Sequence, residues 1–128
     1  MVQKNILATI LINNFNNQKF LKKSIDSCLT QSYKNLEIII YDDKSDDGSN
    51  LILKKIKDKR IKKIFNKKKK YKSSALNQFD AIRKSFLKSK GEIIFLLDGD
   101  DFFFKNKVKI ILDEFRKNKN LNFVQDNP

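Results

Sequence analysis

The most constraining feature of the sequence is a regular alternation of short apolar runs with longer segments of helical spacing. The runs are rich in β-branched residues and cover residues 6–12, 36–41, 61–65 and 92–97. Such runs are typical of strands buried on both faces, which occur in parallel sheets. Parallel strands need crossover connections, and the intervening segments supply them. The sequence therefore predicts an α/β fold, a Rossmann-like open and mostly parallel sheet with helices on both faces.

The predicted helices follow the strands one by one. They lie at residues 20–31, 51–56, 75–86 and 108–115. In the third of these helices the apolar face consists of Ala75, Phe79, Ile82 and Phe86. Their spacing of three to four residues predicts that this face packs on the protein. Gly91 is expected to end the helix, because glycine readily adopts the backbone conformation that closes a helix.

Three further local features complete the predicted domain. Asp47 or Ser49 is expected to cap the helix after the second strand. Residues 121–124 predict a fifth short strand. Neither a linker nor an internal repeat is visible, so residues 1–128 are expected to form one domain.

The composition excludes several kinds of site within this chain. It contains no histidine and one cysteine, which excludes Ser-His-Asp triads, zinc sites of the usual kinds and internal disulfides. The cysteine, Cys28, falls on the apolar face of the first helix and is expected to be an inert core residue. No apolar run approaches the ~20 residues of a membrane-spanning helix.

The net charge of +13 has two interpretations. Lys, Asn, Ile and Phe are all frequent, as AT-rich codons would produce, and the charge then belongs to a solvated surface. Alternatively, the excess serves a polyanionic partner such as an anionic membrane surface. Nucleic acid is not the expected partner, because the lysines are spread along the chain without interleaved stacking aromatics.

Polar residues are concentrated at the carboxyl ends of three predicted strands. Asn13 and Asn14 follow the first, Asp42 and Asp43 the second, and residues 98–101 (Asp-Gly-Asp-Asp) the fourth. Parallel strands bring these ends to one edge, where open α/β sheets bind ligands. Carboxylates gathered there repel one another unless a cation lies between them. Without His or Cys ligands, the expected cation is Mg²⁺ or Mn²⁺, held by carboxylates and substrate phosphates.

These acids could instead serve only to shape turns. For Asp46 and Asp47 the turn interpretation is favoured, because Asp is common in turns after strands. For Asp98 and Asp100 a binding role is favoured, because the cluster directly after an apolar strand is more acidic than a turn requires.

Four segments, in order and at compatible spacing, carry a family resemblance. They read ILINNFN at residues 10–16, SCLTQSY at 27–33, EIIIYDDKSDDGS at 37–49, and GE, LDGDD and KV within 91–108. From about residue 6 to residue 115, the chain resembles the family 2 glycosyltransferases.

The resemblance implies a glycosyltransferase A fold that binds a nucleotide-diphosphate sugar, a UDP-sugar above all. The nucleotide-binding residues that it implies are Asn13, Phe15, Asp42, Asp43 and Asp98. Phe15 would lie beside the base, and Asp43 would accept a hydrogen bond from it. Asp98 and Asp100 match the Asp-x-Asp pair (the DXD motif), which implies Asp98 toward the ribose or sugar and Asp100 on Mg²⁺ or Mn²⁺.

The resemblance also implies a metal-assisted, inverting transfer of the sugar to an unknown acceptor, a saccharide or a lipid-linked saccharide, in cell-envelope polysaccharide synthesis. It implies a cytoplasmic location, with peripheral contact at the inner face of the membrane, and an oligomer. In the family the acceptor half follows this region and supplies the catalytic base. Residues 1–128 are therefore expected to be the donor-binding half, with no base of their own and no activity alone.

Two alternatives and two departures from the family pattern accompany this hypothesis. A non-catalytic module of the same fold would bind a nucleotide or a polyanion without turnover. A receiver-like domain fits the size, but it needs paired acids where this chain has Asn13 and Asn14. Lys44 replaces a glycine of the family, and Leu76 stands where an arginine often contacts the phosphates. Arg83 or the lysines of residues 67–70 would have to replace that arginine.

Overall fold

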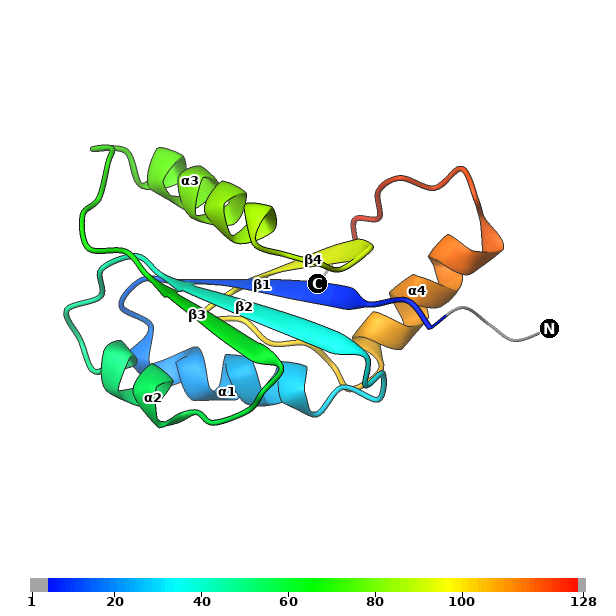
Figure 1. The fold of residues 1–128 in the computed structure, drawn as a ribbon, viewed down its shortest axis with the longest axis horizontal. Coiled ribbons are helices and arrows are strands. Elements are labelled where there is room, and N and C mark those ends of the chain that lie inside the picture. Colours follow the sequence, from blue (N-terminus) through cyan, green and yellow to red (C-terminus); the bar gives the residue numbers. More distant parts are fainter. Residues whose placement is uncertain (1–4, 127–128) are drawn as a thin grey trace.

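The computed structural model describes residues 5–126, in which strands and helices alternate as predicted (Figure 1). The elements are β1 (Ala8–Asn14), α1 (Gln18–Leu29), β2 (Leu36–Asp42), α2 (Ser49–Lys55), β3 (Ile61–Phe65), α3 (Ser74–Leu87), β4 (Ile93–Asp98) and α4 (Lys107–Lys117). Across these residues, no helix has both the length and the apolar character needed to cross a membrane.

The strands form a parallel sheet in the order β3-β2-β1-β4. The chain moves outward from β1 to β3 and then returns past β1 to place β4 on the other side. Because such crossovers are right-handed, this reversal puts α3 on the opposite face from α1 and α2 (Figure 1). The predicted parallel α/β sheet with helices on both faces is confirmed.

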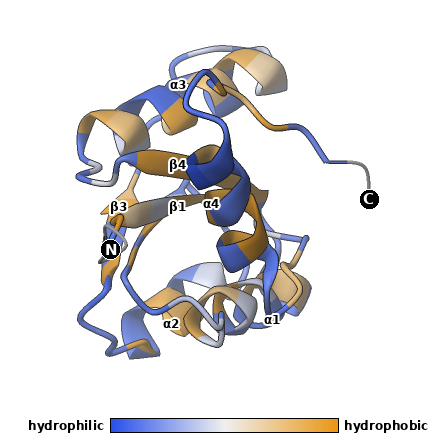
Figure 2. Ribbon diagram, turned by 90° about the vertical axis from the view of Figure 1, so that its right-hand side faces the viewer, coloured by the Kyte–Doolittle hydropathy of each residue, from blue (hydrophilic) through white to orange (hydrophobic). Residues whose placement is uncertain are grey.

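The hydrophobic core lies between one face of the sheet and the helices α1, α2 and α4. Figure 2 shows this arrangement with hydrophobic residues in orange, and α3 on the other side of the sheet. Side chains alternate along a strand, so every second residue of β1 and β2 points to this face. Buried core residues include Ile10, Ile12, Ile38, Ile40, Leu21, Ile25, Cys28, Leu53, Val108 and Leu112. Burial raises the pKa of the Cys28 thiol to about 12, which supports its prediction as an unreactive core residue.

The opposite face of the sheet is partly polar, and α3 covers it with a polar face. The buried residues of α3 are Asn77, Asp80, Ala81 and Ser85. The predicted apolar face points outward instead, with Phe79 66% and Phe86 53% exposed. The expectation that it packs on the protein is therefore wrong. The sheet surface that α3 covers is partly polar, because β1 and β2 place Thr9, Glu37 and Tyr41 on it, and it therefore packs against the polar face of the helix.

Glu37 is the centre of the polar network on this face. Its carboxylate accepts hydrogen bonds from Thr9 Oγ1 at 2.8 Å, Lys62 Nζ at 2.6 Å and the backbone N of Lys90 at 2.7 Å. Burial alone would raise the pKa of this carboxyl, but the hydrogen bonds and the charge of Lys62 outweigh it and lower the pKa. The network ties β1, β2 and β3 to the segment that leads into β4.

Replacing Glu37 by Gln is expected to lower the free energy of unfolding at neutral pH by about 1–2 kcal/mol, because the carboxylate loses its charge-assisted bonds. Because the Glu37 carboxyl has a lower pKa in the folded protein than in the unfolded chain, it stabilises the fold at pH values above its unfolded-state pKa of about 4.3. That contribution disappears as the pH falls through the folded-state value. Urea titrations at several pH values should therefore show a flatter acid dependence for Glu37→Gln. An acid dependence equal to that of the exposed control Glu114→Gln would contradict this prediction.

Three local predictions also differ from the structure. Helix α3 ends at Leu87, so Gly91 lies beyond the helix and does not end it. Glycine is needed at position 91 for space, because a Cβ there would lie 2.3 Å from Thr9 Oγ1. The N-cap of α2 is Gly48 rather than Asp47 or Ser49. Residues 121–124 are not a strand, because they pair with no edge of the sheet in the described part of the chain.

Candidate functional site

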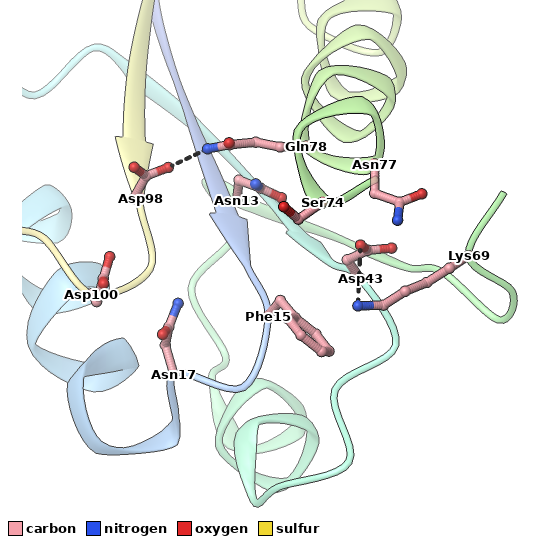
Figure 3. Close-up of a pocket in the computed structure, with 10 residues that line it drawn as sticks. All are labelled: Asn13, Phe15, Asn17, Asp43, Lys69, Ser74, Asn77, Gln78, Asp98 and Asp100. Atoms are coloured by element: carbon pink, nitrogen blue, oxygen red, sulfur yellow. Dashed lines mark hydrogen bonds and ion pairs between the residues drawn. The ribbon is translucent and has the colours of Figure 1, made fainter. Parts of the chain in front are cut away.

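A cavity of about 210 Å³ opens at the carboxyl edge of the sheet, beside the start of α3 (Figure 3). Five of the predicted site residues line it: Asn13, Phe15, Asp43, Asp98 and Asp100. The remaining lining residues are Asn17, Lys69, Ser74, Asn77 and Gln78. Of these, the sequence offered only Lys69, within the lysines of residues 67–70, as a candidate binding residue. Segments distant in sequence thus meet where an open parallel sheet binds its ligands.

Strand register explains why Asn13 and Asp98 share the cavity. The two residues are partners across β1 and β4, so their side chains leave the sheet on the same face. Within residues 5–126, the buried Oδ1 of Asn13 has no hydrogen-bond partner. A buried acceptor without a donor is costly, so this atom is available to a ligand.

One end of the cavity carries Asp98 and Asp100. Gln78 Nε2 donates a hydrogen bond of 3.0 Å to Asp98 Oδ1. Partial burial raises the pKa of Asp98, and the negative charges of Asp100 and Asp101 add to this effect, while the bond from Gln78 opposes it. The raised pKa therefore reflects the burial of Asp98 and the like charges around it.

These two carboxylates fit a divalent cation. Residues 5–126 contain no cluster of three or more Asp, Glu, His or Cys side chains arranged for a metal. Mg²⁺, however, takes only one or two protein carboxylates and completes its shell with water and substrate phosphates. Gly99 makes the turn between the two acids possible, because a Cβ there would lie 2.7 Å from Asn14 Oδ1.

The other end of the cavity carries Phe15, Asp43 and Lys69. The ring of Phe15 is 46% exposed, although a large apolar side chain gains from burial. Asp43 is 6% exposed and accepts a hydrogen bond of 2.8 Å from Asn66 Nδ2. Lys69 Nζ lies 3.8 Å from Asp43 Oδ2. An aromatic face beside a carboxylate acceptor suits a nucleobase, which stacks and donates N–H bonds.

Asp42 differs from its neighbour and does not line the cavity. It is 1% exposed and accepts bonds from Asn14 Nδ2 at 2.8 Å, Ser45 Oγ at 2.7 Å and Ser45 N at 3.0 Å. As the last residue of β2, it points to the face opposite Asp43. The structure thus places Asp42 in the support of the loop, unlike the nucleotide-binding position that the resemblance implied.

The structure agrees with the turn interpretation of Asp46 and Asp47, which lie in the loop after β2. Asp46 accepts a bond from Asn16 Nδ2, and Asp47 accepts bonds from the backbone N of Gln18 and of Ser49. Lys44 has φ = 57°, in the left-handed region that favours glycine. This backbone conformation gives a physical reason for the glycine that the family pattern has here.

The amino-terminal end of α3 forms one wall of the cavity. Asn77 donates to Tyr71 O at 2.8 Å and accepts from Tyr71 N at 3.0 Å, which fixes the chain that enters the helix. A helix N-terminus carries partial positive charge and favours anions. Leu76 is 50% exposed, and Arg83 pairs with Asp80 at 3.1 Å and is not a lining residue. Of the two candidates for the missing arginine, only the lysine run reaches the cavity, through Lys69.

Known proteins resemble the chain over most of its length. It is 35% identical to an uncharacterised glycosyltransferase of Haemophilus influenzae over 94% of this chain and 43% of that protein. It is 38% identical to the Escherichia coli UDP-Glc:alpha-D-GlcNAc-diphosphoundecaprenol beta-1,3-glucosyltransferase WfaP over 80% of this chain and 38% of that protein. The chain therefore spans less than half the length of these relatives.

Solved structures show the same fold. Staphylococcus aureus TarS 1–349 in complex with UDP-GlcNAc matches 88% of this chain and 32% of its own, with a TM-score of 0.70 and 19% identity. The mannosyltransferase PcManGT from Pyrobaculum calidifontis, in complex with GDP-Man and Mn²⁺, matches 75% of this chain and 28% of its own, with a TM-score of 0.60 and 17% identity. The fold is thus the glycosyltransferase A fold that the sequence analysis expected.

The family follows from the sequence match. The model of glycosyl transferase family 2 matches residues 9–127, which include every residue that lines the cavity. This match decides against a receiver-like domain, and it agrees with the relatives described above. The chain belongs to glycosyl transferase family 2.

Proposed function

We propose that this chain is the donor-binding half of a metal-assisted glycosyltransferase that uses a nucleotide-diphosphate sugar. One observation carries the proposal: a single cavity joins an aromatic and carboxylate end, at Phe15 and Asp43, to an acidic end, at Asp98 and Asp100 (Figure 3). A nucleoside diphosphate has the matching order, with a base at one end and two phosphates at the other.

Each part of the cavity has a role in this proposal. The base stacks on Phe15 and donates to Asp43 or to the free Oδ1 of Asn13. Asp100, assisted by Asp98, would hold Mg²⁺ or Mn²⁺, and the metal would stabilise the negative charge of the diphosphate leaving group. Gln78 orients the Asp98 carboxylate through its hydrogen bond.

The comparisons support a UDP-sugar and a metal. TarS has been solved with UDP-GlcNAc and with UDP, and PcManGT with GDP-Man and Mn²⁺. The name of WfaP states UDP-Glc as its donor and a diphosphoundecaprenol-linked GlcNAc as its acceptor. We extend the proposal to a lipid-linked saccharide acceptor, to inversion at the transferred sugar, and to a cytoplasmic site at the inner face of the membrane. The charge of +13 favours contact with anionic lipid.

Thermal unfolding with nucleotides tests the donor site directly. UDP with Mn²⁺ or Mg²⁺ is expected to raise the melting temperature, whereas UDP with EDTA is expected to leave it nearly unchanged. At a ligand concentration of about one hundred times Kd, the gain is about 2.7 kcal/mol, which corresponds to roughly 10 °C for a domain of this size. GDP and CDP, tested in parallel, would identify the base.

The opposite outcomes separate this function from its alternative. If no nucleoside diphosphate shifts the melting temperature with either metal, the donor-site proposal is wrong. The alternative is a non-catalytic polyanion-binding module, which the exposed lysines at 67, 68 and 70 favour. Such a module would bind polyphosphate without metal, and its affinity would fall steeply with salt.

A further inference from the structure

Lys69 lies inside the cavity, unlike its neighbours in the lysine run. Lys67, Lys68 and Lys70 are exposed, whereas the Lys69 side chain is 31% exposed. Its Nζ lies 3.0 Å from the centroid of the Phe15 ring and 3.8 Å from Asp43 Oδ2. Figure 3 shows the chain of Lys69 extended from its loop toward Asp43, with the Phe15 ring beside the ammonium group.

The loop that carries Lys69 is fixed at both ends. On one side, Asn66 donates to Asp43 Oδ1 at 2.8 Å, and its backbone N donates to Asp42 O at 2.8 Å. On the other side, both backbone groups of Tyr71 bond to the Asn77 amide. Only residues 67–70 lie between these anchors. The position of Lys69 therefore follows from a fixed loop rather than from a chance surface orientation.

Lys69 uses the two groups that a nucleobase would need. Its ammonium lies over the ring face on which a base would stack, and it pairs with the carboxylate to which a base N–H would donate. The cavity of about 210 Å³ is also smaller than the roughly 300–1,000 Å³ of ordinary small-molecule sites. A base and the Lys69 ammonium therefore compete for the same place.

We propose that Lys69 is an internal occupant of the base-binding end, and that a nucleobase binds only by displacing it. This inference rests on the proposed function, because it takes Phe15 and Asp43 as the base-binding end. Lys69 thus lowers the affinity for the base and keeps the Asp43 charge compensated while the site is empty. Displacement breaks a cation–π contact and an ion pair, both of which are partly exposed to solvent.

Uridine, which lacks phosphates, isolates the base-binding end from the metal end. Followed by NMR titration, Lys69→Ala is expected to bind uridine about three- to tenfold more tightly than the unchanged protein. The matched control Lys68→Ala removes the same charge from the exposed neighbour and should leave the affinity unchanged. Weaker or equal uridine binding by Lys69→Ala would overturn the displacement proposal.

The salt dependence of uridine binding provides a second test, because the affinity is expected to rise rather than fall with salt. Screening weakens the partly exposed pair of Lys69 and Asp43, so the affinity of the unchanged protein for uridine should rise between about 20 and about 500 mM NaCl. The affinity of Lys69→Ala should stay flat over this range. A salt dependence shared by both proteins would count against displacement.

An NMR measurement on the protein without ligand tests whether Lys69 occupies the site. The Phe15 ring should shift the resonances of the Lys69 ε-CH₂ protons upfield, and Phe15→Leu should remove that shift. An unshifted resonance in the free protein overturns the occupancy of the site by Lys69.

The binding experiments separate the two proposals. If UDP with Mn²⁺ binds but Lys69→Ala does not improve uridine binding, displacement alone is wrong. If the shift is present but no variant binds uridine or UDP, the proposed function fails, and the displacement proposal fails with it.

Discussion

Replacing Asp100 by Asn is expected to abolish the metal-dependent rise in melting temperature that UDP produces. The substitution removes one of the two carboxylates at the acidic end of the cavity and leaves the shape of the side chain almost unchanged. A hard cation depends on carboxylate charge, so the variant should lose most of the roughly 10 °C shift expected at saturating UDP. Differential scanning fluorimetry with UDP, with and without Mn²⁺, measures the difference.

The chain offers a matched control one residue away. Asp101 carries the same charge, but its Oδ1 accepts the backbone N of Phe102, and the residue does not line the cavity. Asp101→Asn should therefore keep the metal-dependent shift. A full shift in Asp100→Asn, or an equal loss in both variants, would remove Asp100 from the proposed metal site.

Replacing Asp42 by Ala is expected to lower the free energy of unfolding by about 3 kcal/mol, measured without any nucleotide. The carboxylate is buried and accepts three hydrogen bonds, from Asn14 Nδ2 and from the hydroxyl and backbone N of Ser45. Hydrogen bonds to a charged group contribute about 1.5–3 kcal/mol each, and the buried donors would be left unpaired. Urea denaturation followed by circular dichroism measures the loss.

Asp46→Ala serves as the control for this stability effect. Asp46 lies four residues along the same loop, is exposed, and accepts a side-chain bond from Asn16. Its replacement should cost about 0.5 kcal/mol or less, as is usual for an exposed polar contact. If Asp42→Ala costs no more than Asp46→Ala, the supporting role of Asp42 is wrong and a direct role in ligand binding becomes the better interpretation.

The sequence predicts the sheet well because strand identity depends on local pattern. The run at residues 36–41 is mostly apolar and is buried on both faces, as is typical of a central parallel strand. The polar ends of the strands fall on one edge, so Asn13, Asp43, Asp98 and Asp100 could be placed together from the strand pattern. Phe15 and the individual binding roles came from the family resemblance.

What the sequence did not predict depends on contacts between distant segments. The outward face of α3 follows from Glu37 and Tyr41 on the sheet beneath it, and no pattern within the helix reveals this. Gln78 enters the cavity from α3, where it bonds to Asp98. Lys69 is held there by a loop whose end residues, Asn66 and Tyr71, bond to Asp43 and Asn77. Asp42, in contrast, could have been separated from Asp43 by the alternation of side chains along β2.

The strand order β3-β2-β1-β4 has a consequence for how the molecule folds. Ala8 pairs with Leu36 on one side and with Ile93 on the other, so β4 closes a far longer loop of chain than β2 does. Long loops cost more entropy to close, and contacts between distant segments form slowly. We therefore expect the β1-β2-β3 unit to assemble first and β4 to join it last. The Phe15 and Asp43 end would then exist before the Asp98 and Asp100 end, so the acidic half of the site would be the last to form and the first to be lost when the fold opens.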